Sequence, residues 1–137
     1  MSETRKCNVF LGGTCNGSTW RDKIIPKLTI DYFNPVVEDW NEEAYNNELK
    51  HRKEDDFLLY VITPKMTGVY AIAELIDDSN KCPERVIVCI LREDDDSRFD
   101  DIQWKSLSKV IVMASKNGAI TLGGLEEVIT YLNAHGK

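Results

Sequence analysis

Short apolar runs alternate with longer amphipathic segments along the chain. The strand-like runs cover residues 7–11, 32–37, 57–62, 85–91 and 119–121. Apolar positions recur at helical spacing in the other segments, which cover residues 19–28, 41–53, 67–78, 103–116 and 124–134. Strands that alternate with helices are typical of parallel sheets joined by right-handed crossovers. The pattern therefore predicts a three-layer α/β/α sandwich around a five-stranded, doubly wound parallel sheet.

The runs at residues 57–62 and 86–91 are continuously apolar, as expected for strands that helices cover on both faces. We expect these two strands to be parallel and the most buried of the sheet. In such sheets, ligands bind beyond the carboxyl ends of the strands, where the strand order reverses. This rule selects the loops at residues 12–19, 34–41 and 63–68 as the expected binding site.

The composition narrows the class of protein. The chain has 137 residues and 42% hydrophobic content, which suits one domain over residues 1–137. A formal charge of -6 without a basic cluster opposes binding to a nucleic acid backbone. No apolar run approaches the roughly 20 residues of a membrane span, and the first residues lack a signal peptide's apolar region. We expect a cytoplasmic protein without a membrane partner.

The four cysteines, Cys7, Cys15, Cys82 and Cys89, form no C-x-x-C pair. We expect reduced, mostly buried thiols and neither a disulfide framework nor a metal site.

A glycine-rich segment, residues 12–18, follows the first predicted strand. It contains neither G-x-G-x-x-G nor the G-K-[ST] of a Walker loop, so it is either a tight turn or a cradle for a sugar or phosphate. The pattern Thr19-x-x-Asp22 just after it predicts a capping box at the start of a helix.

The helix predicted over residues 67–78 follows the most apolar strand. Val69, Ile72, Ala73 and Ile76 form a stripe that we expect to face the sheet, which leaves Glu74 on another face. Glu74 is then either a solvated surface residue or, about two turns beyond Gly68, a group that a ligand can reach.

Several blocks in register resemble the nucleoside 2-deoxyribosyltransferase-like family. They lie between residues 9 and 74 and read Val9-Phe-Leu-Gly-Gly-Thr14, Trp20-Arg21-Asp22, Phe33-Asn34-Pro35-Val36-Val37, Asp39-Trp40-Asn41, Tyr60-Val-Ile-Thr63 and Gly68-x-Tyr70-x-x-x-Glu74. The resemblance implies a flavodoxin-like, Rossmann-like fold, a homo-oligomer, and Glu74 as a catalytic nucleophile. In better known transferases a carboxylate just before the glycine-containing turn helps to hold the base, where this chain has Lys65-Met66-Thr67.

The chemistry that the resemblance implies is attack of a glutamate on the anomeric carbon of a nucleoside or nucleotide, without metal or organic cofactor. Asp39 is the first candidate for assisting the leaving base, with Glu48 and Asp22 behind it. Trp20, Trp40 and Tyr70 are either base-stacking partners or core residues. The expected substrate-binding residues are Gly12, Gly13, Thr14, Asn16, Trp20, Asn34, Gly68 and Tyr70.

The residues leave three functions open. The first is a transferase that exchanges the base on a 2-deoxyribosyl group, the second an N-glycoside hydrolase that uses water as acceptor. The third is a non-catalytic nucleotide-binding module, in which Glu74 only accepts a hydrogen bond from a hydroxyl group.

Overall fold

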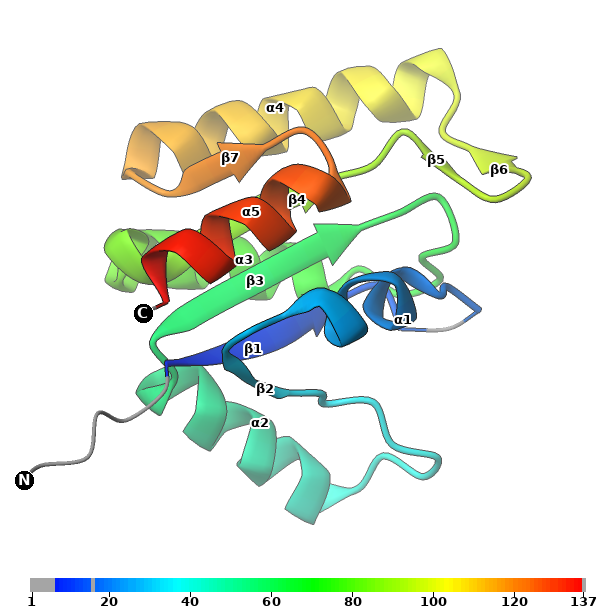
Figure 1. Cartoon of the computed structure of the whole chain (residues 1–137). Helices are drawn as coiled ribbons and strands as arrows, with labels where there is room; N and C mark the ends of the chain where they lie inside the picture. The colour runs from blue at the N-terminus through cyan, green and yellow to red at the C-terminus, as the bar shows by residue number, and fades with distance from the viewer. Residues whose placement is uncertain (1–6, 16, 137) are drawn as a thin grey trace, which may run out of the picture.

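A computed structural model describes residues 7–15 and 17–136. Its strands and helices alternate along the chain (Figure 1). The strands are β1 (Asn8–Gly13), β2 (Asp31–Phe33), β3 (Phe57–Ile62), β4 (Val86–Ile90), β5 (Glu93–Asp94), β6 (Ser97–Arg98) and β7 (Ile120–Leu122). The α-helices are α1 (Trp20–Ile24), α2 (Glu42–Glu54), α3 (Tyr70–Lys81), α4 (Asp101–Asn117) and α5 (Leu125–His135), with 3-10 turns at Ile25–Lys27 and Pro83–Arg85.

The main sheet has five parallel strands in the order β2-β1-β3-β4-β7. Strand order reverses between β1 and β3, as in flavodoxin-like folds. The predicted flavodoxin-like α/β sandwich is therefore confirmed. The prediction for the central strands is confirmed as well, because β3 and β4 are parallel neighbours and nearly all of their residues are buried.

Helices cover both faces of the sheet (Figure 1). On one face, Trp20 of α1 and Val128 and Leu132 of α5 pack against the side chains of β1, β3 and β4. On the other face, Leu75 of α3 and Leu107 of α4 pack against the alternate side chains of the same strands. The period of two along each strand divides the apolar residues between these two cores.

Helix α2 lies at the β2 edge of the sheet (Figure 1). The His51 ring stacks on Phe33 of β2, with ring centroids 3.6 Å apart. The same helix reaches α3 through an ion pair between Arg52 and Asp78. This position brings α2 next to the helix that carries Glu74.

The predicted capping box at the start of α1 is wrong, and the predicted apolar stripe of α3 is right only in part. The side chain of Thr19 makes no capping hydrogen bond, and α1 gives way to a 3-10 turn that contains Pro26. Ile72 and Ile76 of the predicted stripe pack on the core, but Ala73 and Val69, just before α3, are exposed. Leu75 is buried instead, so the helix is rotated relative to the predicted stripe. On this side of α3, Arg52 of α2 forms ion pairs with Glu74 and Asp78, and both carboxylates are buried.

The acidic segment after β4 is mostly exposed but is not an irregular loop. It forms the antiparallel β5–β6 hairpin, and Asp94 within it is buried. Asp94 accepts a 2.5 Å hydrogen bond from the Ser18 hydroxyl group. Asp95 accepts one of 2.6 Å from Lys65, so the hairpin holds the loops after β1 and β3.

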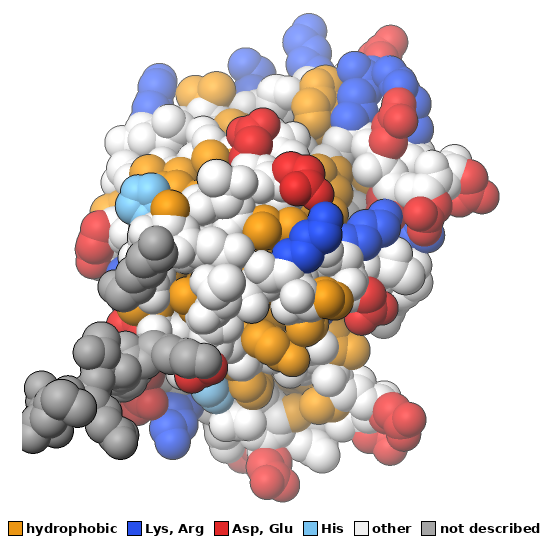
Figure 2. All heavy atoms as spheres, in the orientation of Figure 1, with side chains coloured by type: hydrophobic (Ala, Val, Ile, Leu, Met, Phe, Trp, Pro, Cys, Tyr) orange, Lys and Arg blue, Asp and Glu red, His pale blue; other side chains and the backbone are white. Residues whose placement is uncertain are grey.

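On the face in Figure 2, acidic and basic side chains are interspersed rather than gathered into one basic area. Among residues 7–15 and 17–136, no helix combines the length and the apolar content needed to cross a bilayer.

Candidate active site

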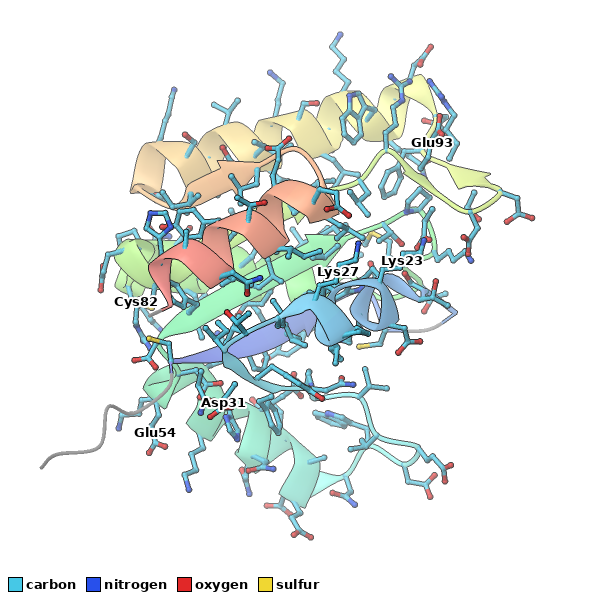
Figure 3. All side chains as sticks on the ribbon, viewed as in Figure 1. Lys23, Lys27, Asp31, Glu54, Cys82 and Glu93 are labelled. Carbon is cyan, nitrogen blue, oxygen red and sulfur yellow. The ribbon has the colours of Figure 1, made fainter. Side chains whose placement is uncertain are left out.

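A cavity of about 290 Å³ lies at the carboxyl ends of β1 and β3, where strand order reverses. In Figure 3, Lys23 and Glu93 mark this end of the sheet, and Glu54 and Cys82 mark the opposite end. The cavity is lined by the ends of these strands, by the loops after β1, β2 and β3, and by residues of α1, α2 and α3. Its lining residues are Gly12, Gly13, Thr14, Cys15, Arg21, Pro35, Val36, Val37, Trp40, Glu48, Ile62, Met66, Thr67, Gly68, Tyr70, Ala71 and Glu74.

The floor of the cavity depends on a close approach between β1 and β3. Gly13 has φ +118°, and a Cβ atom there would lie 2.0 Å from the carbonyl oxygen of Val61. Beyond it, the Thr14 amide donates a hydrogen bond of 2.9 Å to the same carbonyl. The Thr63 amide donates one of 2.9 Å to Oγ1 of Thr14. The loops after β1 and β3 are thus held at a fixed separation.

Arg21 stiffens the loop after β1 from inside. Its guanidinium group donates to the carbonyl oxygens of Leu11 and Thr14, at 2.8 and 2.7 Å, and lies 4.3 Å from the centre of the Trp20 ring. The Trp20 ring is fully buried, and its Nε1 donates a 2.8 Å hydrogen bond to the Thr14 carbonyl oxygen. Arg21 reaches the cavity wall, whereas Trp20 is a core residue.

Glu74 lies on the first turns of α3 and lines the cavity, yet only 7% of its surface is exposed. Burial raises its pKa to about 7. The negative charges of Glu48 and Asp78 contribute to this rise, and the positive charge of Arg52 works against it. Nη1 of Arg52 is 3.5 Å from Oε2 of Glu74. Near neutral pH the carboxyl group is thus poised between its two protonation states.

Glu48 is the second carboxylate of the cavity. It lies on α2, is half-buried, and accepts a 3.0 Å hydrogen bond from Nε1 of Trp40. A pair of carboxylates in one cavity, one of them with a raised pKa, is the arrangement that acid–base and nucleophilic chemistry on glycosides uses.

The structure brings most of the sequence-predicted site residues together. Those that line the cavity are Gly12, Gly13, Thr14, Gly68, Tyr70 and Glu74. Asn16 lies outside the described residues.

Three predicted site residues, Trp20, Asn34 and Asp39, are not among the described lining residues. Trp20 packs in the core, and Oδ1 of Asn34 instead accepts a hydrogen bond of 3.1 Å from the Val36 amide. Asp39 is exposed on the loop after β2.

Glu48 was only a minor candidate in the sequence, and Arg21 and Arg52 were not candidates at all. The available signal was spacing, because Glu48 and Arg52, like Glu74 and Asp78, are four residues apart and share a helix face. Lys65, which stands where the resemblance expects a carboxylate, binds Asp95 and the Gly17 carbonyl oxygen.

The cysteines differ from the prediction in their burial. The described structure contains all four as free thiols, but only Cys89 is buried, and Cys15 is exposed and lines the cavity. In the described part of the chain, no three His, Cys, Asp or Glu residues are grouped so that they could hold a metal ion.

The comparison with known families agrees with this geometry. The family model described as "Nucleoside 2-deoxyribosyltransferase like" matches residues 6–93, which is more than half of the chain. The chain belongs to this family. No curated protein matches it. The matched region contains β1 to β4 and every lining residue of the cavity. Membership of the nucleoside 2-deoxyribosyltransferase-like family supports a role related to glycosyl transfer on nucleosides.

Proposed function

We propose that the protein transfers a 2-deoxyribosyl group between bases of nucleosides or nucleotides through a covalent intermediate on Glu74. The observation that carries this proposal is the position of Glu74. Its carboxyl group is buried in the wall of the cavity at the switch point of the sheet, and its pKa is raised to about 7. A buried carboxyl group in a cleft, with its pKa perturbed by both burial and a specific neighbour, is characteristic of catalytic groups.

In the first half-reaction, a carboxylate oxygen of Glu74 attacks C1′ of the sugar from the face opposite the base. The C1′–O bond forms while the C1′–N bond breaks, and the bonding electrons leave with the base. The transition state resembles an oxocarbenium ion, which a negative carboxylate stabilises. The product is a glycosyl ester of Glu74 and a released base.

The leaving nitrogen needs a proton or a hydrogen bond, and we assign this task to Glu48. Asp39, the first candidate from the sequence, does not line the described cavity, whereas Glu48 does. The like charges of Glu48 and Glu74 disfavour the doubly ionised pair. The reaction starts from the singly protonated pair in which the proton is on Glu48, so that Glu74 attacks as a carboxylate and Glu48 donates as a carboxylic acid.

In the second half-reaction, a nitrogen of the acceptor base attacks C1′ and the ester bond to Glu74 breaks. Glu48 takes up the proton that the acceptor base loses, so the enzyme returns to its starting state. Two successive inversions give net retention at C1′. The reaction as written consumes neither a metal nor an organic cofactor.

The cavity mouth offers surfaces for a flat base. Trp40 and Tyr70 line it and are 57% and 52% exposed, and Val36 and Val37 beside them are exposed as well. Apolar and aromatic contacts tolerate different bases, which suits an exchange reaction.

An N-glycoside hydrolase would use the same ester intermediate with water as the acceptor. A nucleotide-binding module would use the cavity without the ester. The two carboxyl groups in one cavity, one of them buried and with a raised pKa, favour chemistry over binding alone. The homo-oligomer that the resemblance implies remains a prediction.

The proposal is tested by incubating the protein with each deoxynucleoside and deoxynucleoside monophosphate, with and without a free acceptor base, and separating the products by chromatography. We expect a new nucleoside that contains the acceptor base. Free base released at the same rate without any acceptor indicates the hydrolase, and no product with any substrate contradicts the proposed function.

A further inference from the structure

A buried ionic network joins α2 to α3 behind the carboxyl group of Glu74. Arg52 is its centre: Nη1 is 3.5 Å from Oε2 of Glu74, and Nη2 is 3.4 Å from Oδ2 of Asp77. Two further contacts, from Nε and Nη2 to the two carboxylate oxygens of Asp78, are each 3.0 Å. Only 10% of the Arg52 side chain is exposed.

The network is anchored to the central strand. The Tyr60 hydroxyl group on β3 donates a short hydrogen bond to Oδ2 of Asp78. Asp78 therefore holds the guanidinium fork of Arg52 through two parallel hydrogen bonds, the geometry that planar arginine–carboxylate pairs favour. Burial opposes the charge of Arg52, but Asp78 and the other acidic neighbours outweigh it, so the pKa of Arg52 is raised.

The fixed guanidinium group matters because of the other charges around Glu74. Glu48 from α2 and Asp78 from α3 are negative and disfavour ionisation of Glu74, and Tyr60 and Tyr70 lie near enough to sense its charge. Among the causes of the Glu74 shift, Arg52 alone favours the carboxylate. An opposite charge within about 4 to 6 Å favours the ionised form of a carboxyl group.

We propose that Arg52 is a positioning residue that holds the carboxylate of Glu74 in its charged, nucleophilic form and in a fixed orientation at the cavity wall. Asp78 and Tyr60 in turn fix Arg52. This inference rests on the proposed function for its catalytic meaning, but the link between Arg52 and the charge of Glu74 can be measured without turnover.

The first measurement is a pH titration of the side-chain carboxyl carbons of glutamate by NMR in the folded protein. The Glu74 signal is identified by its loss in Glu74→Gln. We expect Arg52→Gln to raise the titration midpoint of Glu74 by about one pH unit or more. Lys53→Gln, which removes the same charge from the next, exposed position of α2, leaves the midpoint unchanged. An unchanged midpoint in Arg52→Gln, or an equal shift in Lys53→Gln, overturns the proposal.

The second measurement is the pH profile of kcat/KM on the substrate that the wild type turns over. In Arg52→Gln, the rise in activity with pH moves upward together with the NMR midpoint. A purely structural role lowers activity at every pH without moving the profile, and that result contradicts the proposal.

If Arg52→Gln does not fold, the same measurements are made on Arg52→Lys. Lysine keeps the charge but lacks the planar fork that binds Asp78 and Glu74 together. We expect the Glu74 midpoint to stay near its wild-type value while kcat falls about tenfold or more with KM retained, because misplaced catalytic groups mainly slow the chemical step. A wild-type kcat in this variant overturns the positioning role.

No turnover in the wild type, together with a shifted midpoint in Arg52→Gln, overturns the proposed function and leaves the control of the Glu74 charge supported.

Discussion

Nε1 of Trp40 donates a hydrogen bond of 3.0 Å to Oε2 of Glu48, and both residues line the cavity. Trp40 comes from the loop after β2, and Glu48 from the middle of α2. The contact directs one carboxylate oxygen of Glu48 toward the indole and leaves the other for a ligand or a proton. Because Glu48 also raises the pKa of Glu74, its position influences both carboxyl groups of the proposed mechanism.

The first prediction concerns Glu48 as the group that assists the leaving base. Glu48→Gln keeps the size of the side chain but removes its capacity to exchange a proton. We expect kcat to fall about 10²- to 10⁴-fold, the usual contribution of general acid–base catalysis. Glu43→Gln, an exposed carboxylate on the same helix, is the matched control and should retain wild-type turnover. Steady-state kinetics on both variants check this, and a Glu48→Gln enzyme as fast as the control rules out the assigned role.

The second prediction is a pH dependence of stability that originates at Glu74. Burial raises the pKa of Glu74 from the ordinary 4.5 to about 7. Between these values the folded protein binds more protons than the unfolded chain, so the free energy of unfolding falls as pH rises through this window. Glu74→Gln removes the titration. We therefore expect the wild type to lose on the order of 1–3 kcal/mol relative to Glu74→Gln between about pH 4.5 and pH 8.

Urea unfolding of the two proteins across this pH range measures the difference. Glu43→Gln again serves as the control, since its stability should follow the wild type at every pH. Parallel stability curves for the wild type and Glu74→Gln would mean that Glu74 titrates with an ordinary pKa.

The third prediction tests the close approach of β1 and β3 beneath the cavity. Gly13→Ala places a Cβ atom 2.0 Å from the Val61 carbonyl oxygen, at a φ of +118°. Neither backbone can move without breaking the ladder, so we expect a loss of about 4 kcal/mol or more in the free energy of unfolding. Gly68→Ala meets no atom within 4 Å and should change stability by less than about 1 kcal/mol. Denaturant unfolding compares the two, and equal stabilities would be inconsistent with the packing at Gly13.

The five strands of the main sheet and the layer order were predictable because apolar run length and strand–helix alternation depend on local sequence. The exception in length is the strand predicted at residues 32–37, which ends at Phe33. Residues 57–62 were predicted as a strand with the bounds that the structure has. The αL cap at Gly118 was predictable as well, because glycine adopts a φ of +107° without strain.

The rotation of α3 was not predictable from its own apolar stripe. Glu74 and Asp78 are buried because Arg52, on another helix, supplies their countercharge, and a helical pattern taken alone assigns such carboxylates to solvent. The Asp94 contact with Ser18 was hidden for the same reason, since 76 residues separate the partners. The glycine loop and Glu74 could be placed in one site because parallel strands bring their carboxyl ends together. The role of Glu48 was not predictable, because it depends on the tertiary position of α2, which brings Glu48 to the same cavity as Glu74.

The fourth prediction concerns the covalent step. Glu74→Gln should fold and bind nucleosides but lose turnover by several orders of magnitude, because the amide cannot form the glycosyl ester. Near-normal turnover in Glu74→Gln would exclude Glu74 as the nucleophile, whatever its effect on affinity.

The most direct test of the central claim is mass spectrometry of the wild-type protein after incubation with a 2-fluoro-arabinosyl nucleoside. The fluorine destabilises the oxocarbenium-like transition state, so the intermediate forms but turns over slowly. The account predicts one fluoro-sugar attached to the peptide that contains Glu74, and no adduct in Glu74→Gln. An adduct on another residue, or an enzyme that turns over this nucleoside and its natural counterparts without ever carrying the sugar, would contradict it.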